Sequence, residues 1–358
     1  MKILRVINSL NIGGAERSIA GNVPLHVMNG FEMDVLLLDG NQTFFVEELK
    51  KNGIKVTWFG VNNFIYNPFF VFKISKIINN YDVVHAHLFP SLYWVALAKI
   101  VTRSKVKLIY TEHSTYNKRR DYFFLKWIDQ FIYNKYDKII AISKEATKAL
   151  SKHIMRTDII TIPNGVDLSK VKEESKIVLN DLSKKYIGKK IIVQVAGFRI
   201  SKDQDTVINC LALLPNKYVV LFVGDGERIE ICKALVEKLN VSDRIEFLGL
   251  QNNIGAILNL ADVVVMSSHW EGFGRAAIEG MALGKPVIAT NVSGLADVVK
   301  DAGLLFEKGN VNQLKELILK LELTDFYALI SKKCEERAEE YNIKKMIDSY
   351  EDIYKALI

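Results

Sequence analysis

The stretch ADVVVMSSHWEGFGRAAIEGMALGKPVIATN, residues 261–291, decides the fold class of the chain. It begins with a short apolar run typical of a buried strand and ends with a second such run, KPVIATN (285–291). Between the two, AAIEGMALG (276–284) has the pattern of a helix. A strand, a helix and a second strand in this order predict a right-handed βαβ unit in a parallel sheet.

The same alternation extends along the whole chain. The apolar runs are short and continuous, as in parallel strands that are covered on both faces. Helical patterns lie between them, so the sequence predicts an α/β protein with two Rossmann-like, doubly wound domains. The predicted strands are 2–8, 34–39, 55–60, 82–87, 107–113 and 138–143 in the first half, and 190–197, 218–226, 244–249, 262–267, 285–291 and 303–306 in the second.

The boundary between the domains is expected near IPNGVDLSK (162–170), because Pro-Asn-Gly is strong turn chemistry. This gives domains of 1–166 and 167–342, which suits a length of 358 residues at roughly 150 residues per domain. Ligands of open α/β sheets bind beyond the carboxyl ends of the strands. Two such domains are therefore expected to face each other across a ligand-binding cleft.

The composition is that of a soluble globular protein, with 49% apolar and 25% charged residues. Three dispersed cysteines indicate a reducing compartment, and no apolar run approaches the ~20 residues of a membrane-spanning helix. We therefore predict a cytoplasmic location. Residues 1–165 hold 22 Lys and Arg against 13 Asp and Glu, which indicates that the first domain meets an anionic surface or substrate.

Within the opening stretch, HWEGFGRAAIEG (269–280) carries three glycines and two glutamates eight positions apart, Glu271 and Glu279. Gly272, Phe273 and Gly274 lead into a helix whose first N–H groups can receive an anion. Carboxylates accept hydrogen bonds from adjacent hydroxyls, so the pair suits a ligand with hydroxyls at both ends and phosphates between them. The alternative is that Glu271 lies in a solvated loop and Glu279 in a surface ion pair.

A second motif, VAGFRISKDQDT (195–206), follows the first strand of the second domain. Arg199 can hold a phosphate through two hydrogen bonds, and Lys202 adds a point charge. Asp203 and Asp205 could instead hold a divalent ion with a nucleotide. Because these aspartates fall where a helix should begin, capping is the favoured interpretation. We predict no metal site.

The first domain contributes a glycine turn and two histidine-bearing strand ends. Gly13 and Gly14 open the first helix and suit either a tight turn or an anion. His113, at a strand end between polar neighbours, could contact a ligand hydroxyl or phosphate. His85 is expected to be a hydrogen-bonded core histidine, and zinc is not expected because no cysteine lies nearby.

Together these motifs resemble the retaining family 4 glycosyltransferases of the GT-B fold. HWEGFGRAAIEGMALGKPVIATNVSGLADVV resembles the Glu-x7-Glu region of that family, and GGAER, HAHLFPS, TEHS, IPNGVD, FRISKD and VGDGE match it in the same order. The resemblance spans nearly the whole chain. It departs at Gly280, where alanine is commoner, and at Asp297, where glutamate is usual.

The resemblance implies a role for each matching position, with the donor in the second domain and the acceptor in the first. The residues near the sugar and phosphates share polar side chains or free N–H groups. They are Gly14 beside the donor phosphate, His113 on the transferred sugar, Arg199 and Lys202 on the diphosphate, Glu271 on sugar hydroxyls, and the turn Gly272, Phe273 and Gly274 on sugar or phosphate.

At the nucleoside end, the resemblance implies that Glu279 accepts the ribose hydroxyls and that the backbone near Gly249 and Leu250 contacts the base. It also implies that a last helix, 343–358, packs back on the first domain. The catalytic residues would be His113, Arg199, Lys202 and Glu271, with no cofactor.

The function implied is transfer of a sugar from a nucleotide sugar, preferentially a UDP-sugar, to a hydroxyl of a glycan or lipid-linked glycan in surface polysaccharide synthesis. Retaining glycosidases use two carboxyls about 5–5.5 Å apart as nucleophile and acid, and no such nucleophile is evident here. The resemblance implies front-face displacement instead. The alternatives are a sugar-nucleotide epimerase of the same fold and a non-catalytic nucleotide-sugar-binding partner.

The segment 115–138, TYNKRRDYFFLKWIDQFIYNKYDK, combines basic residues with aromatic ones. This segment is expected to form an amphipathic helix with a basic patch of Lys118, Arg119 and Arg120. Such a helix could lie on the anionic inner face of the cytoplasmic membrane. The alternative is a helix packed on its own sheet with a solvated basic face. Nucleic acid is not an expected partner, because no recognisable binding module is present.

Overall fold

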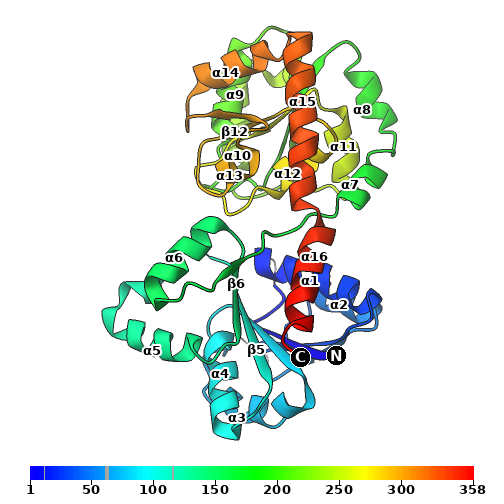
Figure 1. Ribbon diagram of the computed structural model, residues 1–358. Helices are drawn as coiled ribbons and strands as arrows, with labels where there is room; N and C mark the ends of the chain where they lie inside the picture. The colour runs from blue at the N-terminus through cyan, green and yellow to red at the C-terminus, as the bar shows by residue number, and fades with distance from the viewer. Residues whose placement is uncertain (12, 61–63, 115–116) are drawn as a thin grey trace. The chain divides into compact units, whose positions relative to one another are not determined.

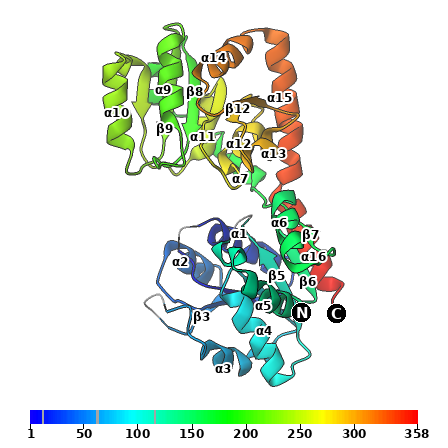
Figure 2. The same ribbon diagram turned by 90° about the vertical axis from the view of Figure 1, so that its left-hand side faces the viewer.

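The computed structural model describes residues 1–11, 13–60, 64–114 and 117–358. The chain forms two compact units, which are Met1–Gly165 with Ile343–Ile358, and Val166–Asn342 (Figure 1). Each unit is built on a wholly parallel sheet with helices around it, as the two views together show (Figure 2). The predicted α/β class with two Rossmann-like domains is confirmed.

The sheet of the first unit has the order β3-β2-β1-β4-β5-β6-β7, so the direction of winding reverses between β1 and β4. This reversal creates the switch point beside which α/β proteins bind ligands. The strands are β1 (Lys2–Ile7), β2 (Glu32–Leu37), β3 (Lys55–Trp58), β4 (Val83–His87), β5 (Lys107–Glu112), β6 (Lys138–Ala141) and β7 (Ile160–Thr161).

The helices of the first unit begin at polar caps where the sequence offers them. Thr43 and Ser143 accept hydrogen bonds from N–H groups three residues on, which fixes where α2 and α6 begin. The helices are α1 (Gly14–Met28), α2 (Phe44–Lys51), α3 (Phe70–Ser75), α4 (Ser91–Thr102), α5 (Phe123–Tyr133), α6 (Lys144–Ile154) and α16 (Ile343–Lys355), with short 3-10 turns η1 (Ile78–Asn80) and η2 (Lys118–Asp121).

The sheet of the second unit has the order β10-β9-β8-β11-β12-β13, with its reversal between β8 and β11. Its strands are β8 (Lys190–Val195), β9 (Tyr218–Val223), β10 (Ile245–Phe247), β11 (Val263–Met266), β12 (Val287–Thr290) and β13 (Leu304–Phe306). Its helices are α7 (Leu168–Glu174), α8 (Asn180–Lys185), α9 (Gln204–Leu213), α10 (Ile229–Lys238), α11 (Ile254–Leu260), α12 (Arg275–Ala282), α13 (Leu295–Val299), α14 (Val311–Lys320) and α15 (Thr324–Ala338), with η3 (Ser242–Arg244) and η4 (Glu339–Tyr341).

Burial on both faces of each sheet explains the continuous apolar runs. In β1, Leu4 and Val6 belong to the core on one face, whereas Ile3 and Ile7 belong to the core on the other. Successive side chains of a strand point to opposite faces, so a strand covered on both sides needs apolar residues throughout. Gly280 of α12 shows how closely the layers pack, because a Cβ there would lie 2.9 Å from Val264 Cγ2.

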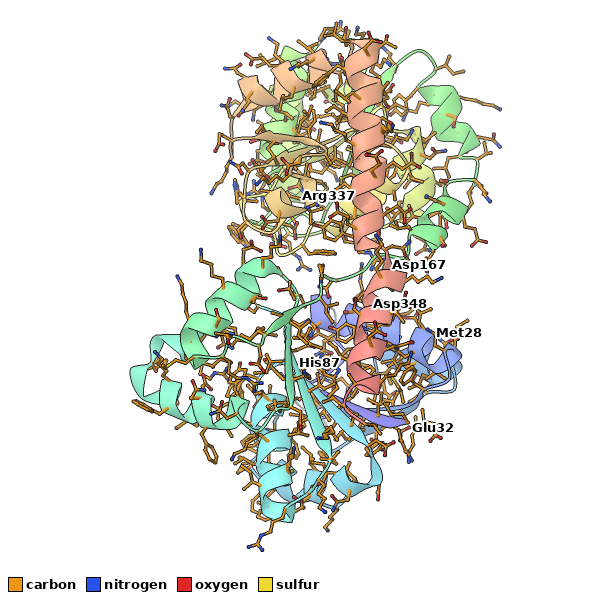
Figure 3. The ribbon with its side chains drawn as sticks, in the orientation of Figure 1. Met28, Glu32, His87, Asp167, Arg337 and Asp348 are labelled. Atoms are coloured by element: carbon orange, nitrogen blue, oxygen red, sulfur yellow. The ribbon has the colours of Figure 1, made fainter. Side chains whose placement is uncertain are left out.

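The last helix, α16, belongs to the first unit and completes one face of its core. Met346, Ile347, Tyr350 and Tyr354 are buried together with residues of β1 and β2. Figure 3 marks Asp348 on this helix and His87 at the end of β4. The first unit is therefore made from two parts of the chain that are separated by the whole second unit.

The structure differs from the sequence-based expectations in three places. The two-residue strand β7 was not predicted, because it is too short to give an apolar run. Val166 lies in the second unit rather than closing the first, since its N–H donates to the carbonyl of Tyr341 at 2.8 Å. The helix expected across 115–138 is divided into η2 and α5, and 115–116 lie outside the described residues.

Within the part of the chain that the structure describes, every helix falls short of the length and apolar character needed to cross a bilayer.

Candidate functional site

The loops that follow β8 and β11 meet at the carboxyl edge of the second sheet. An antiparallel bridge joins Lys202 to Ser268, and the N–H of His269 donates to the carbonyl of Ser201 at 2.9 Å. These contacts bring the ammonium group of Lys202 against the carboxylate of Glu271 in an ion pair. Two residues predicted from motifs about seventy positions apart are therefore neighbours.

Glycines shape the loop that carries Glu271. Gly274 has φ +77° and precedes α12, and a Cβ there would lie 2.5 Å from Leu295 Cδ1. Gly294 has φ +83°, and a Cβ there would lie 2.5 Å from the carbonyl oxygen of Glu271. Both conformations are unfavourable for residues with side chains. Glycine therefore lets the loop pack closely on α13 while the first N–H groups of α12 keep no side-chain cap.

Glu279 lies in α12, and its side chain is 12% exposed. Arg275 Nε donates to Glu279 Oε1 at 2.7 Å, an i,i+4 pair within the helix. Arg275 was not among the predicted site residues, although its spacing from Glu279 was a signal for this pair. The Glu279 carboxylate thus has a partner that holds its orientation.

Arg199 is the cation of this edge that stays solvent-exposed, and it has no ion-pair partner among the residues that the structure covers.

The ends of β9 and β10 are joined by a hydrogen bond, in which the N–H of Gly224 donates to the carbonyl of Gly249 at 2.8 Å. Leu250 is 80% exposed. An exposed apolar side chain beside a strand end is available to contact a flat base. We refer to Arg199, Lys202, Glu271, Arg275 and Glu279 as the second-unit cluster.

The aspartates of the Asp-x-Asp sequence are engaged by the protein itself. Asp203 caps α9 by accepting from the Thr206 N–H at 3.3 Å and the Thr206 hydroxyl at 2.6 Å. Asp205 pairs with Arg228 at 2.5 Å. The capping interpretation is confirmed for Asp203 and wrong for Asp205, which lies in the first turn of α9. Among the residues described, His, Cys, Asp and Glu side chains form no group of three able to hold a metal ion.

In the first unit, Gly14 is the first residue of α1, at the carboxyl end of β1. A Cβ at Gly14 would meet no atom within 4 Å, so packing inside the protein does not require glycine there. Gly13 precedes the helix in an extended conformation without a side-chain cap. The carboxylate of Glu16 lies over this helix start, since a Cβ at Gly13 would clash with it, so an incoming anion would have to displace that side chain to reach the N–H groups.

Histidines at the ends of β4 and β5 form a second cluster. His85 is fully buried, and its ring nitrogens lie 2.8 Å from the Tyr354 hydroxyl and 2.7 Å from the Thr111 hydroxyl. The prediction that His85 is a hydrogen-bonded core histidine is confirmed. His87 stacks on His85 with ring centroids 4.2 Å apart. We refer to Arg5, His85, His87 and His113 as the first-unit cluster.

His113 lies after β5, and His87 Nδ1 is 3.0 Å from His113 Nε2. His87 Nε2 is in turn 3.0 Å from a guanidinium nitrogen of Arg5, which is fully buried. Burial, followed by the nearby charge of Arg5, lowers the pKa of His113 to about 3. Arg5 and His87 were missed in the sequence. A charged residue inside the apolar run KILRVI was the signal for a buried functional cation.

The basic patch expected at 118–120 is wrong for two of its three members. Arg119 is buried, 3.2 Å from a carboxylate oxygen of Asp129, and its guanidinium lies 4.5 Å from the ring centroid of Phe89. Arg120 forms a buried ion pair with Glu112. Both arginines neutralise carboxylates inside the unit rather than facing solvent. The placement of the Lys118 side chain lies outside what the structure describes.

The exposed face of α5 is aromatic instead of basic. Trp127 is 72% exposed, Phe131 51% and Ile128 46%. Lys135 lies over the Phe131 ring at 4.5 Å from its centroid. The alternative of a helix whose apolar stripe is packed in the core is therefore also wrong for these three residues.

Two family models match the chain in succession. The one described as Glycosyltransferase Family 4 matches residues 12–170, and the one described as Glycosyl transferases group 1 matches residues 180–347. An uncharacterized glycosyltransferase of Methanocaldococcus jannaschii is 32% identical over 263 residues, which cover 70% of this chain and 69% of that protein.

An Escherichia coli protein named UDP-Gal:alpha-D-GlcNAc-diphosphoundecaprenol alpha-1,3-galactosyltransferase is 28% identical over 308 residues, or 79% of this chain and 77% of that one. The crystal structure of Anabaena HepE in complex with UDP superposes with a TM-score of 0.86 at 22% identity, and covers 99% of this chain and 100% of that chain. At this identity the structural likeness concerns the fold.

Proposed function

The chain belongs to family 4 of the glycosyltransferases, with the group 1 region in its second half, and we propose that it is a retaining enzyme that uses a UDP-sugar. The acceptor that we propose is a hydroxyl of a glycan or lipid-linked glycan. One observation carries the proposal above the others. The loops after β8 and β11 place Lys202 and Glu271 in contact at the carboxyl edge of the second sheet.

The second-unit cluster has the chemistry that a sugar diphosphate requires. Arg199 and Lys202 supply positive charge for the diphosphate, and the uncapped start of α12 supplies N–H groups. Glu271 accepts hydrogen bonds from sugar hydroxyls, and Glu279 accepts them from the ribose. The phosphates would take Lys202 as their counter-ion, which releases the Glu271 carboxylate for the sugar.

Transfer breaks the bond between the anomeric carbon and the β-phosphate oxygen and forms a bond from that carbon to the acceptor oxygen. The acceptor proton passes to the departing diphosphate oxygen on the same face of the sugar, so the configuration is retained. Negative charge grows on the leaving diphosphate, where Arg199 and Lys202 stabilise it. Such pre-positioned charges are usually the largest contribution to catalysis.

No metal is needed in this scheme, so EDTA should leave the rate of sugar transfer intact. Loss of transfer in EDTA that added Mg²⁺ restores would contradict the scheme.

Two alternatives make different predictions for the products. An epimerase would release a changed sugar without an acceptor, and a non-catalytic binding partner would hold the donor without turnover. The name of the Escherichia coli relative, a diphosphoundecaprenol-linked galactosyltransferase, favours a transferase with a lipid-linked acceptor. Incubating a panel of nucleotide sugars with polyprenyl-diphosphate glycans, and analysing the products by mass spectrometry, distinguishes the three.

Paired variants test how the donor is held. Glu279→Ala should weaken UDP binding about tenfold, because it removes the hydrogen bonds to the ribose. Glu271→Ala should leave UDP binding nearly unchanged but lower the rate of transfer. Glu230→Ala, in an exposed ion pair on α10, is the matched control. Calorimetry and transfer assays in which both site variants behave like this control would refute the assignment.

A lipid-linked acceptor would bring the enzyme to the inner face of the cytoplasmic membrane. The exposed Trp127, Ile128 and Phe131 of α5 support peripheral contact, since aromatic side chains partition into the lipid interface. The double variant Trp127→Ser and Phe131→Ser should sediment severalfold less with vesicles that contain anionic lipid. Ile231→Ser, equally apolar and exposed on α10, serves as the control. Equal sedimentation of the double variant and the parent would exclude this surface.

A further inference from the structure

Three side chains from three strands form a continuous hydrogen-bonded row inside the first unit. Arg5 comes from β1, His87 from the end of β4, and His113 follows β5. A guanidinium nitrogen of Arg5 lies 3.0 Å from His87 Nε2, and His87 Nδ1 lies 3.0 Å from His113 Nε2. His113 Nδ1 is buried and has no hydrogen-bond partner among the residues described.

The direction of every hydrogen bond in this row is fixed by Arg5. A guanidinium group only donates, so His87 Nε2 must accept and the His87 proton lies on Nδ1. That Nδ1–H then donates to His113 Nε2. In a neutral imidazole, accepting at one nitrogen places the proton on the other. The row therefore ends in an Nδ1–H donor on His113.

The surroundings hold the row in this state. The guanidinium of Arg5 lies 5.4 Å and 5.6 Å from the ring centroids of Tyr350 and Tyr354 on α16. In the described part of the chain, Arg5 has no carboxylate partner within ion-pair distance. Its uncompensated charge opposes a second proton on His87 or His113. A proton added to His113 Nε2 would also face the Nδ1–H of His87.

We propose that Arg5 and His87 are positioning residues that keep His113 neutral and protonated at Nδ1, so that His113 donates a hydrogen bond to an oxygen of the nucleotide sugar. The oxygen is a sugar hydroxyl or a phosphate oxygen, both of which accept. His113 then cannot serve as the base that deprotonates the acceptor, because its Nε2 lone pair is used and its Nδ1 already carries hydrogen. This role of His113 rests on the proposed transferase function, whereas the protonation state does not.

The state of His113 is tested on the full chain without substrate. Long-range ¹H–¹⁵N correlation spectra of ¹⁵N-histidine protein distinguish the two neutral forms of imidazole from the charged form. His113→Asn identifies the signals of that residue among the six histidines. We expect His113 to be neutral and protonated at Nδ1 from pH 8 to pH 6. A proton on Nε2, or a charged ring within this range, would overturn the proposal.

Two substitutions of His87 separate positioning from packing. An asparagine amide can replace the Nδ1–H donor, whereas a glutamine amide reaches the Nε2 position and contacts Arg5 instead. His87→Gln should leave His113 a mixture of neutral forms. It should lower kcat at least tenfold with little change in KM for the donor, because the hydrogen bond that is lost strengthens as charge develops on the departing group. His87→Asn should restore the Nδ1–H form of His113 and most of the lost kcat.

Equal loss of kcat in the two His87 variants, with the same His113 spectrum in both, would overturn the positioning role. Arg5→Met adds a further comparison and should mix the His113 forms in the same way as His87→Gln. If Arg5→Met fails to fold, the His87 pair still decides. If the protein lacks transferase activity altogether, the spectra still show the protonation state of His113. A wrong function and a wrong protonation state can therefore be distinguished.

Discussion

The two clusters hold their charged groups in opposite ways. In the second-unit cluster the charges lie on loops and on the surface of α12, where Lys202 pairs with Glu271 and Arg275 with Glu279. In the first-unit cluster Arg5 is fully buried in a strand, and the imidazole of His87 is its hydrogen-bonded neighbour. One cluster contains charges that can change partners, and the other contains a charge that cannot move.

The difference follows from what each arrangement costs in free energy. The Lys202–Glu271 pair joins two loops and keeps 18% of each side chain exposed, so an incoming phosphate can take the place of Glu271 beside Lys202. A buried charge is costly to leave without partners, at about 3–5 kcal/mol, so its surroundings must stay fixed. Substitutions in the second-unit cluster should therefore affect catalysis, whereas those of buried charges in the first unit should affect folding.

The largest expected effect is on catalysis in the second unit. Lys202→Met should lower the rate of transfer about 10²–10³-fold, because one pre-positioned charge on the leaving diphosphate is lost. The unfolding temperature should stay within a degree or two of the parent. Lys233→Met, which breaks an exposed pair with Glu230, is the control. A Lys202→Met enzyme that keeps its rate and loses stability would reverse the contrast between the clusters.

A smaller effect, now on stability, is expected in the first unit at Asp129. Its carboxylate is buried, binds Arg119 at 3.2 Å and His153 at 2.6 Å, and accepts from the Tyr93 hydroxyl. Asp129→Asn would leave Arg119 buried without its counter-charge and should cost about 3 kcal/mol of the free energy of unfolding.

Differential scanning calorimetry would show the Asp129→Asn effect as a fall of several degrees in the transition of the first unit. Asp158→Asn, whose carboxylate is mostly exposed beside Arg156, should change that transition by less than a degree or two. The same shift in both variants would mean that burial of Asp129 does not matter.

The response to pH should also separate the units. Burial and the charge of Arg5 lower the pKa values of His85, His87 and His113, the last to about 3. The unfolded chain, with an ordinary pKa near 6.5, therefore binds more protons than the folded one as the pH falls below about 6.5.

Stability of the first unit should thus be full above pH 6.5 and decline as the pH falls, by up to about 2 kcal/mol for each imidazole at pH 5. Segment-resolved hydrogen exchange at pH 7.5 and pH 5, corrected for the intrinsic exchange rate, measures this. We expect lost protection in β1, β4 and β5 beyond any change in β8 and β11. Equal changes in both sheets would contradict the assignment to these histidines.

The fold could be predicted because strands covered on both faces must be apolar throughout, and that pattern is local. Lys202 and Glu271 could be placed together because parallel strands bring their carboxyl ends to one edge. Arg5 could not be placed, since nothing within KILRVI indicates the histidine of β4, His87, that accepts a hydrogen bond from it. The patch at Arg119 and Arg120 was wrong for a related reason. Glu112 lies on a strand outside the predicted helix, and ten residues of a continuous helix would hold Asp129 about 15 Å along the axis from Arg119. A helical pattern considered by itself therefore assigns both arginines to solvent.

The position of α16 has a consequence for how the protein is made. Residues 1–165 leave the ribosome long before residues 343–358, yet Tyr350 and Tyr354 of α16 enclose Arg5 and complete one face of the first core. Domains usually fold in the order of synthesis. Here the second unit can complete its folding first, because its chain is continuous. Until α16 is made, the face of the first unit around Arg5 stays exposed to solvent. The helix that completes the surroundings of the histidine row is therefore translated only after the whole second unit.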